Sequence, residues 1–165
     1  MPKKERKRFG LLDPGYNYLL NPYPELRFTK CPVCEAKTGQ RKLPLVVHVD
    51  PLNLINLNYT HRYCRRCNTL IGHQHEIEES LFILFLQHNP EVIGNRYVII
   101  GTMELKTWRA GLNQQLSISE ARVHIHDLKT YEELRMTMAG WFHKDQEPPV
   151  MEPAPSAVWV KKGKV

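Results

Sequence analysis

The chain has 165 residues, of which 42% are hydrophobic and 24% charged. This composition is typical of a soluble globular protein and excludes a wholly disordered or a fibrous chain. The longest apolar run, residues 81–86, has six residues, far fewer than the roughly 20 that a membrane-spanning helix needs. The N-terminus is rich in lysine and arginine and has no apolar signal region, so we expect a cytoplasmic protein without a membrane partner.

The formal net charge of +6 is unevenly distributed along the chain. Residues 1–67 carry a net charge of +8, whereas residues 68–147 carry −4. A polyanion such as DNA or RNA would therefore bind the first part of the chain. Residues 1–8, with five lysines and arginines, are predicted to form a disordered basic tail, although such a tail can also serve solubility alone.

Residues 9–28 combine apolar side chains with prolines and other turn formers, which disfavours a continuous helix. A segment this apolar is expected to pack as an arm across the following module. Residues 43–49 and 54–63 have the composition of strands, with residues 50–53 as the turn between them, and residues 69–75 are a plausible third strand.

Residues 76–88 are predicted to form a helix, because acidic side chains at its start and a His-Asn-Pro stop at its end complement the helix dipole. The apolar side chains of residues 81–86 cover nearly its whole circumference, so we expect burial on more than one side. Further strands are expected over residues 97–102 and 123–128.

A short helix is expected over residues 104–112. Thr130 and Glu133 have the spacing of a capping box, which predicts a second helix from residue 130 to about residue 143. Residues 146–165 are predicted to form a proline-rich C-terminal tail. Within this tail, residues 158–160 could dock as an edge strand.

All four cysteines occur in two Cys-x-x-Cys pairs, Cys31/Cys34 and Cys64/Cys67, separated by 29 residues. Two residues between cysteines allow one tight turn to present both sulfurs to one ion. Two such turns supply the four thiolates of a tetrahedral zinc site. We therefore predict one structural Zn²⁺ per chain, held by these four residues.

This pattern resembles the zinc-ribbon class over residues 29–76. The resemblance rests on the two cysteine pairs and the β-rich segment between them, although that segment is longer than usual. Zinc-ribbon turns often have glycine soon after the second cysteine, where this chain has Glu35 and Asn68. The resemblance implies a structural zinc in a small β-module whose members bind nucleic acid or proteins.

Two other interpretations of the cysteines remain open. A disulfide pair needs an oxidising compartment, which the absence of a readable signal peptide disfavours. A redox-active pair sits at a helix N-terminus and would leave the second pair unexplained. A different metal or an iron–sulfur cluster is also compatible with four thiolates.

Cations surround both cysteine pairs. Because the two pairs would close on one ion, these cations should lie at one end of the module, where they can contact phosphates. Alternatively, their role is limited to compensating the negative charge of the four thiolates. The predicted nucleic-acid-binding residues are Lys30, Lys37, Arg41, Lys42, Arg62, Arg65 and Arg66.

Two histidine pairs have i, i+2 spacing, which on a strand places both side chains on one face. Each pair, His73/His75 and His124/His126, could supply two ligands to a second metal, but no third ligand is placed by spacing. Hydrogen-bonded or surface histidines are the simpler interpretation. The chain has no P-loop, nucleophile elbow, H-E-x-x-H or dinucleotide-binding glycine motif.

The patterns together predict an α+β fold: the arm and a zinc-ribbon β-module over residues 9–76, followed by a small mixed α/β unit over residues 77–145. The expected function is a zinc-stabilised binding module associated with DNA or RNA. A protein–protein adaptor or subunit of a larger assembly is the alternative, and would expose apolar side chains from residues 9–26 or 77–88. A metal-dependent enzyme using the histidine pairs ranks third.

Overall fold

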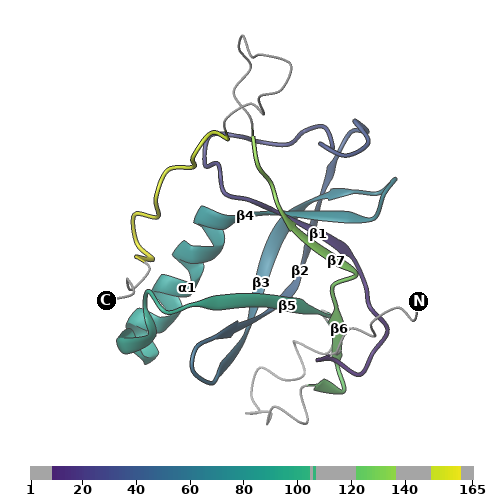
Figure 1. Ribbon diagram of the computed structural model, residues 1–165. Helices are drawn as coiled ribbons and strands as arrows, with labels where there is room; N and C mark the ends of the chain where they lie inside the picture. The colour runs from purple at the N-terminus through teal and green to yellow at the C-terminus, as the bar shows by residue number, and fades with distance from the viewer. Residues whose placement is uncertain (1–8, 105, 107–121, 137–149, 161–165) are drawn as a thin grey trace, which may run out of the picture.

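A computed structural model describes residues 9–104, 106, 122–136 and 150–160. This part of the chain forms a mixed, sheet-dominated α+β fold (Figure 1). The strands are β1 (Asn17–Asn21), β2 (Gly39–Val49), β3 (Asn53–Cys64), β4 (Thr69–His73), β5 (Tyr97–Met103), β6 (Ile125–Asp127) and β7 (Thr130–Glu133). The α-helix is α1 (Gln74–His88), which is followed by the 3-10 turn η1 (Pro90–Val92). The predicted tail of residues 1–8 and most of the predicted helix 104–112 lie outside the described residues.

The strands form one seven-stranded sheet in the order β6-β5-β2-β3-β4-β1-β7. The two outer strands, β6 and β7, are separated in the sequence by only Leu128 and Lys129. Both edges of the sheet therefore belong to one segment, and the sheet curls back on itself into a half-barrel (Figure 1). Strands from both predicted units, residues 9–76 and 77–145, belong to this sheet, and the boundary between the units stays a prediction.

The N-terminal arm runs along the segment that joins the sheet edges. Leu12 bridges His126 in parallel, and the Lys129 backbone N–H donates to the Tyr16 carbonyl at 2.7 Å. The Asp127 carboxylate accepts hydrogen bonds from two backbone N–H groups at the start of the arm, at 2.8 and 2.7 Å. The arm is therefore packed, as its apolar content predicted, and it continues into β1, which pairs in parallel with β4 and β7.

The long β2–β3 hairpin supplies much of the core. Both predicted strands are confirmed, and each extends beyond the predicted range because its backbone continues to pair with its neighbour. Leu43, Leu45, Val47 and Val49 alternate along β2 and are buried in the main core cluster. This period of two is what a strand with one face on a core requires.

Helix α1 begins two residues earlier than predicted and packs one face against the core. Ile77, Leu81 and Phe85, four residues apart, are buried, whereas Ile83 and Leu86 are each 53% exposed. Phe82 and Leu84, on either side of this stripe, are partly buried against the same core. The prediction of burial on more than one side was nevertheless wrong, because the core covers one broad face of α1 and leaves the opposite face exposed. Within the described residues, no helix is long and apolar enough to cross a membrane.

Residues 130–133 form strand β7, so the helix predicted to start at Thr130 is wrong at this point. Capping-box spacing is a local signal, whereas the backbone of β1 offers an open edge whose hydrogen bonds β7 satisfies. Residues 137–143, the rest of that predicted helix, lie outside the described residues. Near the C-terminus, the predicted docking of residues 158–160 occurs through the buried Trp159 side chain, and no strand forms there.

His61 on β3 is fully buried, with its ring edge-to-face against Tyr18 at 5.5 Å and Tyr59 at 4.6 Å between centroids. Burial lowers the pKa of His61 to about 3, and the nearby His73 also lowers it. The imidazole is therefore neutral in the folded protein over a range in which an exposed histidine is protonated.

We expect His61 to make folding less favourable in acid. The unfolded chain binds a proton near pH 6.5 and the folded chain does not, so the free energy of unfolding falls by up to about 1.4 kcal/mol per pH unit as the pH drops from 6.5 towards 3. His61→Leu should remove this contribution. Urea denaturation of both proteins should show their stability difference shifting by about 1.4 kcal/mol in favour of the variant between about pH 7.5 and about pH 5.5. An identical difference at both pH values would contradict the assignment.

Candidate metal centre

The four cysteine side chains converge at one end of the half-barrel. Their Sγ atoms all lie within 4.8 Å of one another, with 3.5 Å between Cys31 and Cys67 and 3.4 Å between Cys34 and Cys64. A tetrahedral ion with zinc–sulfur bonds of 2.3 Å separates its sulfurs by about 3.8 Å, and a disulfide would bring two of them to about 2.05 Å. The spacing fits four ligands of one metal ion, and the cysteines are free thiols.

The first knuckle, residues 31–34, is the tip of a small antiparallel loop. Lys30 and Lys37 form an isolated bridge across its base, and the Cys31 backbone N–H donates to the Ala36 carbonyl at 2.8 Å. The Val33 backbone N–H donates to Cys31 Sγ at 3.4 Å. Backbone donors of this kind stabilise a thiolate and orient it towards the metal.

The second knuckle, residues 64–67, is the turn between β3 and β4, where Cys64 pairs with Thr69. Strand β1 holds this turn from outside: the Asn17 backbone N–H donates to the Asn68 carbonyl at 3.0 Å, and Asn17 Nδ2 donates to the Cys67 carbonyl at 3.1 Å. The second knuckle is therefore fixed by three strands of the sheet.

The residue after each cysteine pair has a left-handed backbone, with φ of 63° at Glu35 and 55° at Asn68. These are the positions where glycine would be expected in a zinc-ribbon turn. Asn68 tolerates this conformation well and its Oδ1 accepts a hydrogen bond from the Tyr63 hydroxyl at 2.9 Å. Glu35 is exposed and carries the steric cost of a Cβ in this region.

The four thiols influence one another's pKa values through hydrogen bonds and burial. Burial raises the pKa of Cys64, but hydrogen bonds from the Cys67 backbone and the neighbouring thiols outweigh it and lower this pKa to about 7. Burial and the neighbouring thiols raise the pKa of Cys67 to about 12. Four thiolates this close repel one another, so a bound dication would displace the remaining protons and stabilise all four charges.

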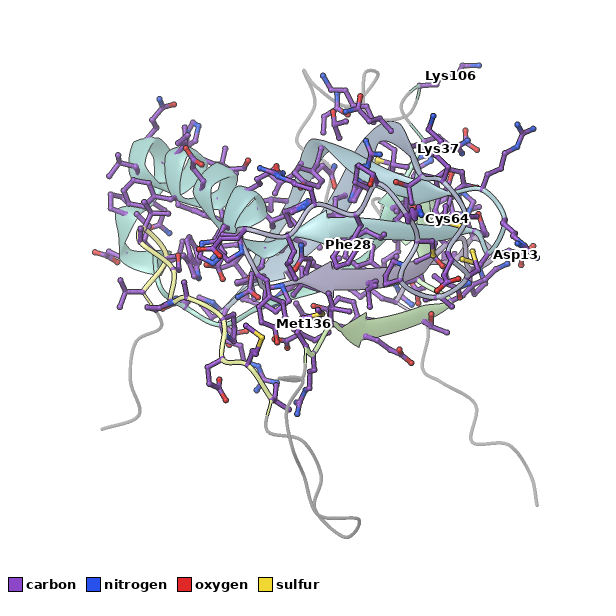
Figure 2. The ribbon with its side chains drawn as sticks, turned by 90° about the horizontal axis from the view of Figure 1, so that it is seen from above. Asp13, Phe28, Lys37, Cys64, Lys106 and Met136 are labelled. Carbon is purple, nitrogen blue, oxygen red and sulfur yellow. The ribbon has the colours of Figure 1, made fainter. Side chains whose placement is uncertain are left out.

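The structure places the predicted cations in three different environments. Arg62 is half-buried, and its guanidinium donates to the Phe28 carbonyl at 3.3 Å and to Thr38, whose Oγ1 lies 2.9 Å from its Nη2. Arg41 lies over the Tyr63 ring, 4.2 Å from the centroid, and donates to the Tyr16 hydroxyl at 2.9 Å. The other predicted cations, all with exposed side chains, are Lys30, Lys37, Lys42, Arg65 and Arg66. Figure 2 shows Lys37 and Cys64 towards the same end of the molecule, with α1 at the opposite end.

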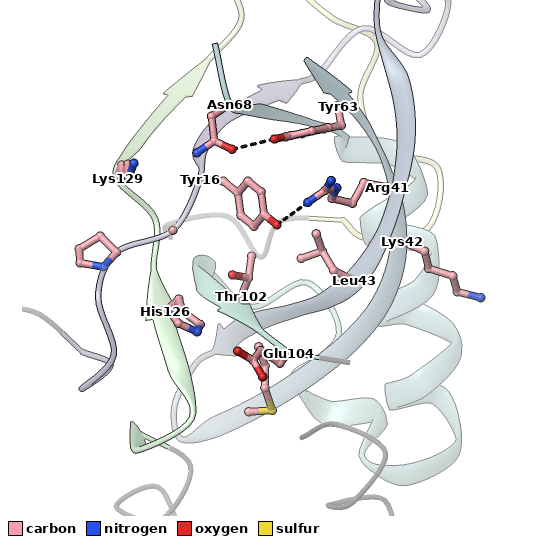
Figure 3. Close-up of a pocket in the computed structure, with 13 residues that line it drawn as sticks. Tyr16, Arg41, Lys42, Leu43, Tyr63, Asn68, Thr102, Glu104, His126 and Lys129 are labelled. Atoms are coloured by element: carbon pink, nitrogen blue, oxygen red, sulfur yellow. Dashed lines mark hydrogen bonds between the residues drawn. The ribbon is translucent and has the colours of Figure 1, made fainter. Parts of the chain in front are cut away.

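An open groove of about 680 Å³ lies beside the second knuckle, at the mouth of the half-barrel (Figure 3). Arg41 from β2 and Lys129 from the segment that joins the sheet edges line opposite sides of it, and Glu104 adds one acidic group. The Lys42 side chain lies on the outer side of β2 and points away from the groove (Figure 3). Tyr16 and Tyr63 line it, with their rings edge-to-face at 5.8 Å. Composition alone did not reveal this groove, because Tyr16 and Lys129 are far apart in the sequence.

The histidine pairs do not form a second metal site in the described part of the chain, where the cysteine cluster is the one group with metal-binding geometry. His73 ends β4 whereas His75 lies in α1, so the strand spacing predicted for this pair does not apply. His73, His75 and His126 each donate a ring N–H to a backbone carbonyl, of Leu26, Ala154 and Asp13 respectively. His124 precedes β6 and does not share a strand with His126.

No family model, no curated protein and no solved structure matches this chain. The geometry of the cysteine cluster and its surroundings therefore carries the functional conclusion.

We expect the purified protein to hold one zinc ion per chain and to depend on it for folding, because zinc binding by four cysteines contributes on the order of 10 kcal/mol. Cys64→Ser should lose the metal and the cooperative unfolding of the sheet around it. Elemental analysis and thermal melting test both points. A reduced, well-folded preparation without bound metal would overturn the prediction.

Glu35→Gly should raise the free energy of unfolding by about 0.5 kcal/mol. Removing the Cβ relieves a left-handed strain of about 1–2 kcal/mol, and the greater entropy of glycine in the unfolded chain offsets part of this gain. Asn68→Gly is the matched comparison, and should not stabilise because it also removes the acceptor of the Tyr63 hydroxyl. Chemical denaturation of the metal-saturated proteins measures both changes. A Glu35→Gly protein less stable than wild type would contradict this account.

Proposed function

We propose that this protein is a zinc-stabilised module that binds nucleic acid through the surface around its cysteine cluster. Zinc is the metal that fits best, because a compact set of four thiolates with tetrahedral spacing favours it. The positions of the two knuckles at loop and hairpin tips support a zinc-ribbon-like arrangement built into the larger sheet. In this role the metal is structural, since four protein ligands leave no open coordination position.

The observation that carries the proposal is the cationic, tyrosine-lined groove next to the second knuckle. Arg41 is held over Tyr63, and guanidinium planes and tyrosine rings are surfaces on which unpaired bases stack. Lys129 lines the same groove and can contact a flanking phosphate, and Lys42 extends the positive charge along the outer side of β2. This combination favours single-stranded DNA or RNA over duplex.

Arg65 and Arg66 extend the cationic surface onto the second knuckle, and Lys30 and Lys37 onto the base of the first. All four side chains are exposed, as phosphate contact requires. We assign Arg62 a different role, because its hydrogen bonds to Phe28 and Thr38 hold the chain on either side of the first knuckle.

A protein–protein adaptor is the second candidate, and one observation favours it. Ile83 and Leu86 lie one turn apart on α1 and are each 53% exposed. Most of the arm does not support this alternative, since Tyr18, Leu19 and Leu20 are buried in the sheet. The adaptor would bind through α1, at the end of the molecule away from the knuckles (Figure 2).

The proposal predicts salt-sensitive binding of single-stranded oligonucleotides. The double variant Arg65→Ala/Arg66→Ala should lower the slope of log K against log salt by about 1.4 for a single strand, or about 1.8 for a duplex. Fluorescence anisotropy with labelled DNA and RNA at several salt concentrations measures this slope.

Arg96→Ala is the matched control. Arg96 is exposed and precedes β5, at the opposite end of that strand from the groove residues Thr102 and Met103. Its removal should leave the salt slope unchanged. Absence of binding at low salt by the zinc-loaded wild type would reject nucleic acid and favour the adaptor.

A further inference from the structure

Residues 150–160, named here the strap, cross the molecule beside α1 (Figure 1). The Tyr23 hydroxyl donates to the Met151 carbonyl at 2.7 Å and accepts from the Met136 backbone N–H at 2.8 Å. At the other end of the strap, the buried Trp159 donates its indole N–H to the Asn95 carbonyl at 3.1 Å. The strap is thus fixed at both ends and encloses a space against the body of the protein.

That space is a cavity of about 580 Å³, named here the strap cavity. This volume is within the range of small-ligand sites. Among the described residues that line it, the acidic side chains are Glu78, Glu133 and Glu152 and the cationic one is Arg135. Its charge is opposite to that of the groove beside the cysteines, and the two share no lining residue.

Glu78 is the unusual member of this lining, because it is only 1% exposed. Its Oε1 accepts hydrogen bonds from Gln74 Nε2 at 2.9 Å and from the Tyr97 hydroxyl at 2.8 Å. Burial and the Glu78 carboxylate raise the pKa of Tyr97, so this hydroxyl stays a proton donor. The side chain is therefore fixed in place from two directions.

The second carboxylate oxygen, Glu78 Oε2, is buried and has no hydrogen-bond partner among the residues that the structure describes. Buried carboxylate oxygens are costly to leave without a donor, and an unpaired one points to a missing partner. Glu78 lines the strap cavity, so a donor that occupies the cavity reaches Oε2 once the side chains that now cover this oxygen shift aside.

The rest of the lining indicates that this donor is a cation. Glu133 and Glu152 are exposed at the cavity and outweigh the positive charge of the exposed Arg135, so the lining attracts a positive ligand. Tyr23 and Trp159 also line the cavity, and aromatic rings stabilise ammonium and guanidinium groups. The metal-binding geometry found at the cysteines is not repeated by these carboxylates in the described part of the chain, which favours an organic cation over a metal ion.

We propose that the strap cavity is a binding site for an organic cation, an ammonium or guanidinium group, with Glu78 Oε2 as its buried acceptor. Such a group comes either from a lysine or arginine side chain of a partner protein or from a free polyamine. Both sources present the same N–H donors and positive charge to Glu78.

Isothermal titration of the full-length, zinc-loaded protein with three probes separates these sources. The probes are Nα-acetyl-lysine amide, Nα-acetyl-arginine amide and spermidine, and the uncharged Nα-acetyl-norleucine amide is the control for apolar binding. Saturable binding of a cationic probe, tighter than about 1 mM and at least tenfold tighter than that of norleucine amide, is the expected result. Preference for an amino acid amide over spermidine identifies a protein side chain as the source, and the reverse preference identifies a polyamine.

Glu78→Gln replaces the unpaired oxygen and its charge, and should weaken binding of the cationic probe at least tenfold. Glu79→Gln is the matched control, since Glu79 is the exposed neighbour on α1 and does not line the cavity. If Glu78→Gln does not fold, the double variant Glu133→Gln/Glu152→Gln tests the negative electrostatic potential of the cavity by changing exposed residues only. This double variant should weaken binding of the cationic probe several-fold.

Three results would overturn the proposal: no saturable binding of any cationic probe by the folded wild type, equal binding of norleucine amide, or undiminished binding by a folded Glu78→Gln protein. The first of these would mean that water alone occupies the cavity.

Discussion

The meeting of four thiols within 4.8 Å is the constraint on which the cysteine end of the molecule depends. It joins a loop that precedes β2 to the turn between β3 and β4. Asn17 then ties that turn to β1, and through β1 to the rest of the sheet. Thiolates at this distance repel unless a cation lies between them, so metal binding and the order of these loops are one equilibrium. The knuckle cations keep their relative positions only while that equilibrium favours the closed cluster.

A second constraint places the groove beside this cluster. Residues 125–133 form both edges of the sheet, so the closure of the half-barrel sets Lys129 opposite Arg41. Tyr63 directly precedes Cys64, and Asn68 directly follows Cys67, with a hydrogen bond from the tyrosine hydroxyl to the amide. Fixing Cys64 and Cys67 at the metal centre therefore also fixes their neighbours Tyr63 and Asn68, which line the groove. This links the structural metal to the surface proposed for binding.

Local patterns predicted the cysteine cluster and the β2–β3 hairpin because spacing and alternation are properties of neighbouring residues. The same local logic failed at Thr130, where the open edge of β1 determined a strand. It also failed at Ile83 and Leu86, since the sequence shows that side chains are apolar but not how much core surface a helix meets. Arg62 illustrates the limit for the site: its position near a cysteine was evident, but its partners are backbone carbonyls and a threonine that only the fold brings into reach.

The division of charge along the sequence reappears in space, but not residue by residue. Lys129 belongs to the acidic stretch 68–147 and yet lines the cationic groove, because the sheet closes beside the knuckles. Glu152 belongs to residues 148–165, which carry a net charge of +2, and yet lines the acidic strap cavity, because the strap returns across α1. Topology thus assembles two surfaces of opposite sign from a chain whose net charge would predict only one. Since these surfaces share no lining residue, an anionic and a cationic ligand can be bound at the same time without competing for a side chain.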